Sequence, residues 1–152
     1  MALAWTEDLT TGIDVIDHQH LRIVDYINRL EEAILMQDRC FVGSVLGELM
    51  DYTLSHLAFE EALQEEAGYT MAKQHKAVHD GFVKRIEKYL QKYEAGEDIA
   101  TKVHGTLLTW LVHHIKRDDM AYVPVVKANS AKRLRDKKGN TWLDQLLGRL
   151  FR

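Results

Sequence analysis

Residues 42–66, VGSVLGELMDYTLSHLAFEEALQEE, decide the fold that this sequence can adopt. Apolar, aromatic and imidazole side chains recur there every three or four residues, which places them on one face of an α-helix: Val45, Leu49, Tyr52, His56, Phe59 and Leu63. Gly68 follows the stretch, and glycine is favoured just past the end of a helix. The pattern therefore predicts one long amphipathic helix whose buried stripe contains a histidine.

Three more helices with the same spacing are expected on either side of this one. They cover about residues 17–36, a segment from an N-cap at Thr70 through residue 93, and about residues 99–116, the last fading before Pro124. The connections are short, and no alternation typical of β-strands competes with the helical pattern. We therefore predict an all-α protein, an up-down-up-down four-helix bundle with an N-terminal arm and a short C-terminal amphipathic helix.

Composition narrows the class of protein further. The chain has 152 residues, 46% of them hydrophobic, so it can bury a core without a disulfide, and its single cysteine, Cys40, has no partner within the chain. Its apolar runs are far shorter than the ~20 residues of a membrane span, and its acidic start does not look like a secretory signal. We therefore expect a cytoplasmic protein and, in the simplest case, a monomer.

Charge is distributed unevenly along the chain. Residues 127–152 carry eight lysines and arginines against two aspartates, so within the net charge of −3 residues 1–126 hold −9. An acidic body argues against nucleic-acid binding, which needs clustered basic residues. We expect residues 1–126 to form the bundle and residues 127–152 a basic extension. Its short helix, capped by Thr141, would pack back on the bundle or dock to a membrane surface or a partner protein.

Histidines and carboxylates sit where they could meet inside the bundle. In the two middle helices they are four residues apart and so share a face: His56 with Glu60, and His75 with His79. The outer helices add His20, and His114 with Asp118 and Asp119. Such groups need a partner when buried, and five imidazoles with two carboxylates suit iron, copper or zinc better than calcium or magnesium. The set is large enough for two metal ions.

Spacing alone leaves the carboxylate of the fourth helix open. Asp118 is four residues after His114 and would share its face in a regular α-helix. Asp119 is five residues after His114, about 140° around the axis, so it could join only if the helix loosens or bulges.

Four stretches resemble the bacterial hemerythrins, and the resemblance covers about residues 5–122. They are Trp5 with Gly12-Ile13 and Ile16-Asp17-x-Gln19-His20, then His56-x-x-x-Glu60, then His75-x-x-x-His79, and finally Trp110-Leu111-x-x-His114-Ile115-x-x-x-Asp119-x-x-Tyr122. All seven ligand positions of that family are matched in order, and the match selects Asp119 rather than Asp118.

The resemblance implies a non-haem di-iron centre. One iron would be held by His75, His79 and His114, the other by His20 and His56, with Glu60, Asp119 and an oxo or hydroxo group as bridges. In that family dioxygen binds at the iron with two histidines. Three apolar residues near the ligands are candidate walls of the oxygen pocket, although ordinary core packing explains them equally well: Trp110, Leu111 and Phe59.

The implied function is reversible dioxygen binding, for storage, buffering or delivery to an oxygen-consuming enzyme that could dock on residues 127–152. A carrier of this kind needs no catalytic residue. Two alternatives share the same centre. One is an oxygen or redox sensor that signals through the C-terminal extension, and the other is a di-iron peroxidase or nitric-oxide-reducing enzyme.

Overall fold

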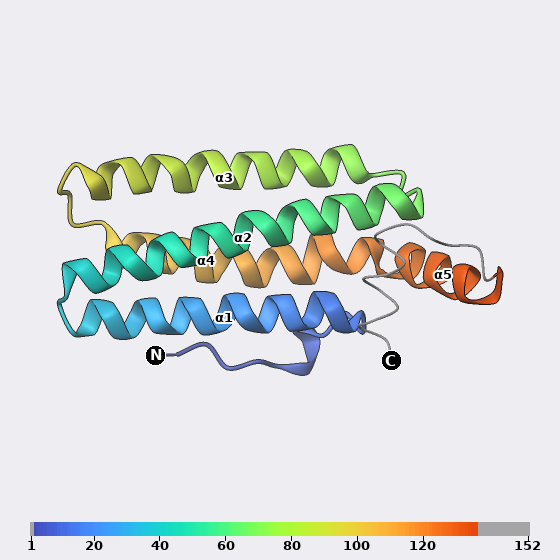
Figure 1. The fold of residues 1–152 in the computed structure, drawn as a ribbon, viewed down its shortest axis with the longest axis horizontal. Coiled ribbons are helices and arrows are strands. Elements are labelled where there is room, and N and C mark those ends of the chain that lie inside the picture. Colours follow the sequence, from blue (N-terminus) through green and yellow to red (C-terminus); the bar gives the residue numbers. More distant parts are fainter. Residues whose placement is uncertain (1, 137–152) are drawn as a thin grey trace.

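The computed structural model of this protein describes residues 2–136, and they contain helices and no strand. Four helices lie along one another: α1 (Asp14–Leu35), α2 (Arg39–Ala67), α3 (Ala72–Glu94) and α4 (Ala100–His114). A π-helix (Ile115–Asp119) continues α4 into α5 (Met120–Asp136), and a 3-10 helix (Glu7–Leu9) interrupts the N-terminal arm. The predicted all-α four-helix bundle is confirmed (Figure 1).

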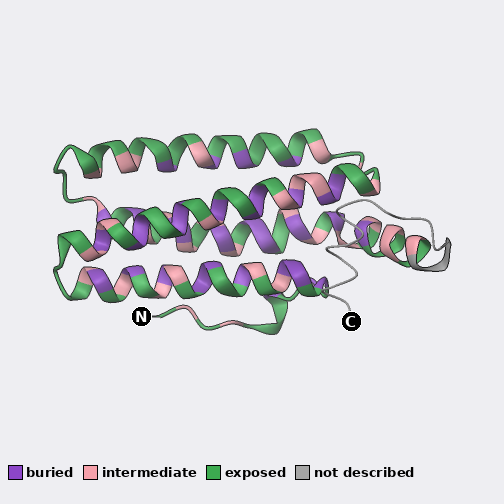
Figure 2. Ribbon diagram, in the orientation of Figure 1, coloured by how far each residue is buried: buried purple, intermediate pink, exposed green. Residues whose placement is uncertain are grey.

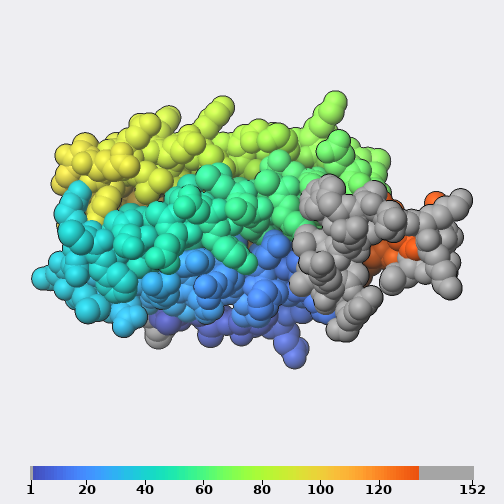
Figure 3. Space-filling view, viewed as in Figure 1, coloured from blue at the N-terminus to red at the C-terminus, as the bar shows by residue number. Residues whose placement is uncertain are grey.

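Helix α2 packs against α1 and α3, and α4 closes the ring by packing more extensively against α1 than against α3. Figure 3 shows α2 between α1 and α3 on one face, with side chains filling the space between them. Buried residues follow one side of each helix (Figure 2). Every helix contributes a fully buried aliphatic side chain to the main core, such as Ile27, Leu49, Ile86 and Val103.

The N-terminal arm runs back along α1 (Figure 1). The side chain of Asn28 fixes its beginning by accepting from the backbone N–H of Leu3 at 2.9 Å and donating to the carbonyl of Leu3 at 3.1 Å. An ion pair between Asp8 and Lys116 ties the arm to the π-helix. The arm is therefore anchored at two points, one on α1 and one beside the candidate ligands of the fourth helix.

Helix α1 begins three residues before its predicted start at residue 17. The carboxylate of Asp17 lies in the first turn and accepts hydrogen bonds from the N–H groups of Thr11 and Gly12 at 2.8 and 2.9 Å. Asp17 thus orders the turn that leads into the helix, which shifts the helix start to Asp14. Periodicity could not place this start, because the capping interaction runs backwards from inside the helix.

In the connection between α2 and α3, one predicted helix cap is correct and the other is wrong. Gly68 ends α2 in the left-handed conformation with φ of 70°, and the N–H of Tyr69 returns to the carbonyl of Gln64. The predicted N-cap at Thr70 is wrong. Helix α3 begins at Ala72, Met71 takes the N-cap position, and no side chain caps it. At the other end of α2, Asp38 is the N-cap and accepts from the N–H of Phe41.

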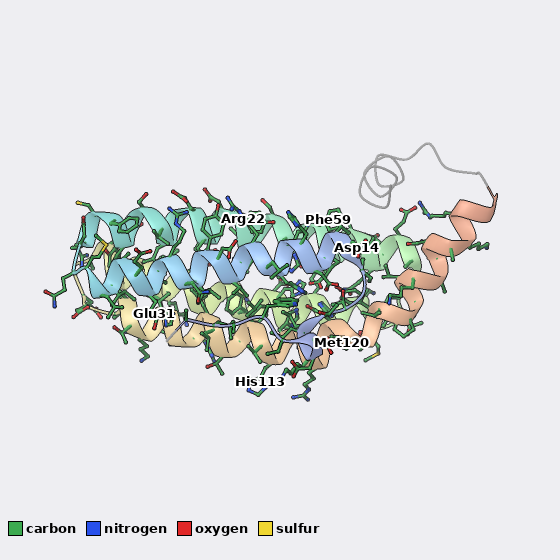
Figure 4. All side chains as sticks on the ribbon, turned by 90° about the horizontal axis from the view of Figure 1, so that it is seen from below. Asp14, Arg22, Glu31, Phe59, His113 and Met120 are labelled. Carbon is green, nitrogen blue, oxygen red and sulfur yellow. The ribbon has the colours of Figure 1, made fainter. Side chains whose placement is uncertain are left out.

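The fourth helix does not fade before Pro124, as the sequence suggested. It passes through the π-helix into α5, which contains Pro124 and extends to Asp136. Pro124 cannot donate to the preceding turn, and α5 turns away from the axis of α4 (Figure 4). Packing outweighs this loss, because Tyr122 and Val126 of α5 are buried against Ile16 and Leu63 in a second core at the end of the bundle.

The proposed boundary after residue 126 falls inside α5, so helical structure continues across it. Arg133 of α5 forms an ion pair with Glu66 of α2. The predicted C-terminal amphipathic helix from Thr141 lies outside the described residues. Among the helices that are described, none is long and apolar enough to cross a membrane.

Two glycines with open surroundings should respond in opposite ways to alanine. A Cβ at Gly68 would meet no atom within 4 Å, but its φ of 70° should make Gly68→Ala destabilising by about 1–2 kcal/mol. Gly81 lies exposed within α3 with equally open surroundings, so Gly81→Ala should stabilise by about 0.5–1 kcal/mol. Urea unfolding of both variants in the same metal state measures the difference, and equal shifts would contradict the assigned backbone of Gly68.

Candidate metal centre

All seven predicted ligands meet inside the bundle. They come from each of the four helices and from the π-helix, and each is at most 5% exposed: His20, His56, Glu60, His75, His79, His114 and Asp119. The helices converge on this level because the ligands belong to the same buried stripes that form the core. A cluster of this size in the interior of a small bundle is what the sequence predicted.

The cluster divides into two overlapping groups in which ligand atoms lie within 4.8 Å of one another. One group holds three histidines and a carboxylate: Glu60, His75, His79 and His114. The other holds two histidines and the same carboxylate: His20, His56 and Glu60. Glu60 belongs to both, so the arrangement can hold two cations that share a carboxylate.

The two carboxylates lie between the imidazoles. Glu60 Oε2 is 3.1 Å from His79 Nε2, 3.4 Å from His75 Nε2 and 3.9 Å from His56 Nε2. Asp119 bridges the cluster in the other direction, with one oxygen 2.9 Å from His114 Nε2 and the other 3.2 Å from His20 Nε2. Each carboxylate thus faces histidines from both groups.

Several of these buried polar atoms have no hydrogen-bond partner among the described residues. They are both ring nitrogens of His20, Nε2 of His75, Oε2 of Glu60 and both oxygens of Asp119. Buried polar atoms without partners are costly and therefore rare in folded proteins. Coordination of cations by the same atoms would compensate this cost, so the donor set fits a metal centre.

The outward nitrogens of three histidines are held by hydrogen bonds. His56 Nδ1 is 2.7 Å from Gln19 Oε1, His79 Nδ1 is 2.9 Å from Glu61 Oε1, and His114 Nδ1 is 2.9 Å from Asp118 Oδ2. In the neutral ring, which is the form that binds a metal ion, an acceptor at Nδ1 keeps the proton there and leaves Nε2 as a lone pair that points inward. Only Gln19 and Asp118 appeared in the sequence analysis, and neither was given this role.

The π-helix explains how Asp119 enters the site. Its wider turn lets residues five apart share a face, so His114 and Asp119 both point inward, as the loosening of the helix required. Asp118 instead reaches the outer nitrogen of His114 and is partly exposed. His113, the residue before His114, points away from the bundle (Figure 4).

Burial and neighbouring charges give the ionisable groups very different affinities for protons. Burial lowers the pKa of His56 to about 3. Burial also disfavours the charged form of His114, but the close carboxylates of Asp119 and Glu60 outweigh it and raise the pKa of His114 to about 10. Burial opposes ionisation of Glu60 as well, yet the close imidazoles of His114, His75 and His79 hold the pKa of Glu60 well below its usual range.

Tyr122 supports Glu60 from the second core. Its hydroxyl donates to Glu60 Oε1 and is buried. Burial, followed by the nearby charges of Glu60 and Asp119, raises the pKa of Tyr122 well above its usual value. The phenol therefore keeps its proton and holds one oxygen of Glu60, which leaves Oε2 to face the histidines.

A small cavity lies against the cluster. Its volume is about 10 Å³, roughly the space that one water-sized molecule occupies, and its walls come from α1, α2, α3 and α4: Ile23, Ile27, Thr53, His56, Phe82, Leu107, Trp110, Leu111 and His114. Trp110 and Leu111, two of the three candidate pocket walls, line this cavity beside His56 and His114. Phe59 is not among these walls. It packs against the second core with Leu63 instead.

Trp110 lies between the cavity and the surface. Its indole stacks on the imidazole of His114, with 4.2 Å between ring centroids and 14° between planes, and on Phe82 at 3.7 Å. It also lines an open groove between α3 and α4, together with Arg85 and His113. The indole therefore separates the buried cavity from solvent on that side.

Comparison with known proteins agrees with this geometry. A family model described as the hemerythrin HHE cation binding domain matches residues 11–126. Bacteriohemerythrins of Pseudomonas aeruginosa and Stenotrophomonas maltophilia are 43% and 46% identical over 149 residues, which is 98% of this chain and 97% of each relative. A crystal structure of wild-type hemerythrin superposes with a TM-score of 0.79 at 30% identity, covering 83% of this chain and 98% of that one.

Fold and site together define a helical-bundle protein with a buried, histidine-rich cation centre. The extent and identity of the matches are sufficient to place it more narrowly: the chain belongs to the bacteriohemerythrin family.

His56 and His114, whose pKa values are shifted in opposite directions, give a direct test of the site in metal-free protein. Free imidazoles titrate near pH 6.5, as they should in the unfolded chain. In the folded, metal-free protein His114 should stay protonated up to about pH 10 and His56 should stay neutral down to about pH 3.

By linkage, His56 contributes stability above pH 6.5 that is lost toward pH 3, and His114 contributes stability below pH 6.5 that is lost toward pH 10. Nitrogen-15 shifts of the two rings, assigned with His56→Gln and His114→Gln, measure both titrations. Ordinary titration of both rings near pH 6.5 would contradict the described geometry.

Proposed function

We propose that this protein binds dioxygen reversibly at a di-iron centre and serves to store, buffer or deliver it. The observation that carries the proposal is the buried cluster of seven ligand-type side chains, several of whose polar atoms have no hydrogen-bond partner within the described part of the chain. The bacteriohemerythrin names of its relatives and the cation-binding description of its domain support the choice of iron.

The ligands would be shared unequally between the two ions. His75, His79 and His114 would hold one iron, His20 and His56 the other, and Glu60 and Asp119 would bridge them. When bound there, a pair of irons would supply the electrons that dioxygen can accept. His56, a ligand of the iron that it would share with His20, also lines the cavity, which gives a small molecule a place to bind.

The residues around the cavity favour binding over catalysis. Apart from His56 and His114, its lining contains no carboxylate, imidazole or amine that could transfer a proton. Apolar walls such as Leu107 and Leu111 exclude water, which limits the loss of charged products from the centre. We therefore propose a carrier rather than an enzyme.

Iron loading and optical spectroscopy test this function. Metal-free protein loaded anaerobically with iron(II) should hold two irons per chain, and oxygen should produce a visible charge-transfer band that purging removes. The same cycle on Glu60→Ala, which lacks the shared carboxylate, should show fewer than two irons and no reversible band. A wild-type band that forms once and cannot be reversed by purging would contradict the proposed function.

The hydrogen bond between Asp118 and the outward nitrogen of His114 should strengthen metal binding. Asp118→Ala removes the acceptor at His114 Nδ1, so binding of cobalt(II) or iron(II) should weaken about 10- to 100-fold. Glu48→Ala is the matched control, because Glu48 pairs with Arg29 on the exposed surface of α1 and α2 and should leave affinity unchanged. Competition with a chelator measures both, and equal affinities would show that Asp118 does not support the site.

A further inference from the structure

Thr53 carries a buried hydroxyl that the proposed function does not use. It lies in α2, one turn before His56, and is 2% exposed. Its Oγ1 has no hydrogen-bond partner among the described residues. A buried hydroxyl in this state is destabilising relative to a methyl group of the same size.

Two other helical hydroxyls in this protein, neither of them fully buried, bond within their own helices. A serine or threonine within a helix usually donates to the carbonyl four residues before it. Ser55 does so with the carbonyl of Asp51, and Ser130 with that of Val126, both at 3.0 Å. Thr53 does not make the equivalent bond to Leu49, although it lies in the same helix as Ser55. Its isolation is therefore a property of its position.

The position borders the cavity beside the candidate irons. Thr53 lines it together with His56 and His114, and it is the one residue among the walls that carries a hydroxyl. The rest of the lining is aliphatic or aromatic. Since no atom of residues 2–136 forms a hydrogen bond with Oγ1, a small molecule in the cavity is the partner that its location offers.

We infer that the Thr53 hydroxyl donates a hydrogen bond to a small ligand held in this cavity, one that is anionic or gains negative charge when it binds, such as azide or dioxygen. The inference rests on the proposed function, since the ligand would be attached at the iron of His56. Thr53 is a positioning residue, because it orients and retains the ligand without touching the metal. A donor aimed at developing charge should slow release of the ligand.

Thr53→Val is the decisive variant because it replaces the hydroxyl by a methyl group of nearly the same volume. In iron-loaded protein, azide affinity should fall roughly tenfold and dioxygen should dissociate faster by a similar factor. Thr53→Ser keeps a hydroxyl and should stay much closer to wild type. Thr109→Val, on the exposed groove side of α4, is the matched control and should change neither quantity.

The metal-free protein gives a second measurement that does not depend on iron. There the hydroxyl forms no hydrogen bond with any of the described residues, so Thr53→Val should leave the thermal midpoint equal to or above that of wild type. A lower midpoint would show that the fold already satisfies the hydroxyl, and it would overturn the inference.

The two proposals can fail separately. If Thr53→Val loads two irons and binds azide and dioxygen as wild type does, the role of Thr53 is wrong and the carrier function stands. If wild type itself neither loads two irons nor binds dioxygen, the proposed function fails and the inference falls with it, whatever the midpoint of Thr53→Val.

Discussion

Burial of seven ionisable side chains in one level of a small bundle is the constraint on which the rest of the structure depends. Such groups are stable in an apolar interior only if they compensate one another or bind an ion of opposite charge. Their compensation requires all four helices to converge at the same height, which fixes helix register as firmly as the aliphatic core does. A slide of one helix by a single turn, about 5.4 Å, would separate the ligands. Fold and centre therefore specify each other.

The orientation of three imidazoles depends on residues that are adjacent in the sequence to the candidate ligands. Each of the three outer acceptors is the chain neighbour of an inner ligand: Gln19 precedes His20, Glu61 follows Glu60, and Asp118 precedes Asp119. Adjacent residues on a helix point about 100° apart, so one carboxylate or imidazole faces the interior while the next side chain flanks it and reaches a histidine ring. Pairs of adjacent polar residues thus build both layers of the site.

Much of this arrangement could be predicted from the sequence, because the apolar core residues and the candidate ligands recur with the same helical spacing and so lie on the same faces. The four helices and the convergence of His56, Glu60, His75 and His79 follow from residues four apart. Helix starts and continuations were less predictable, since they depend on tertiary partners. Asp17 caps the turn before α1 from within the helix, and burial of Tyr122 carries α5 through Pro124. Phe59 lies on the same helix face as Leu63 and packs with it against the second core. Residue spacing alone could not show which of the two cores Phe59 would join.

The π-helix affects how the fourth helix could tolerate the insertion or deletion of a residue. Within a regular helix, a codon gained or lost rotates every later residue by about 100°, which would turn the stripe of α5 away from the core. The wider turn at Ile115–Asp119 accommodates one additional residue between His114 and Asp119 while Tyr122 and Val126 remain buried. This short segment is therefore a place in the fourth helix where chain length and helix phase are uncoupled, and it coincides with a carboxylate of the centre. A change in length there would alter the candidate metal site before it altered the fold.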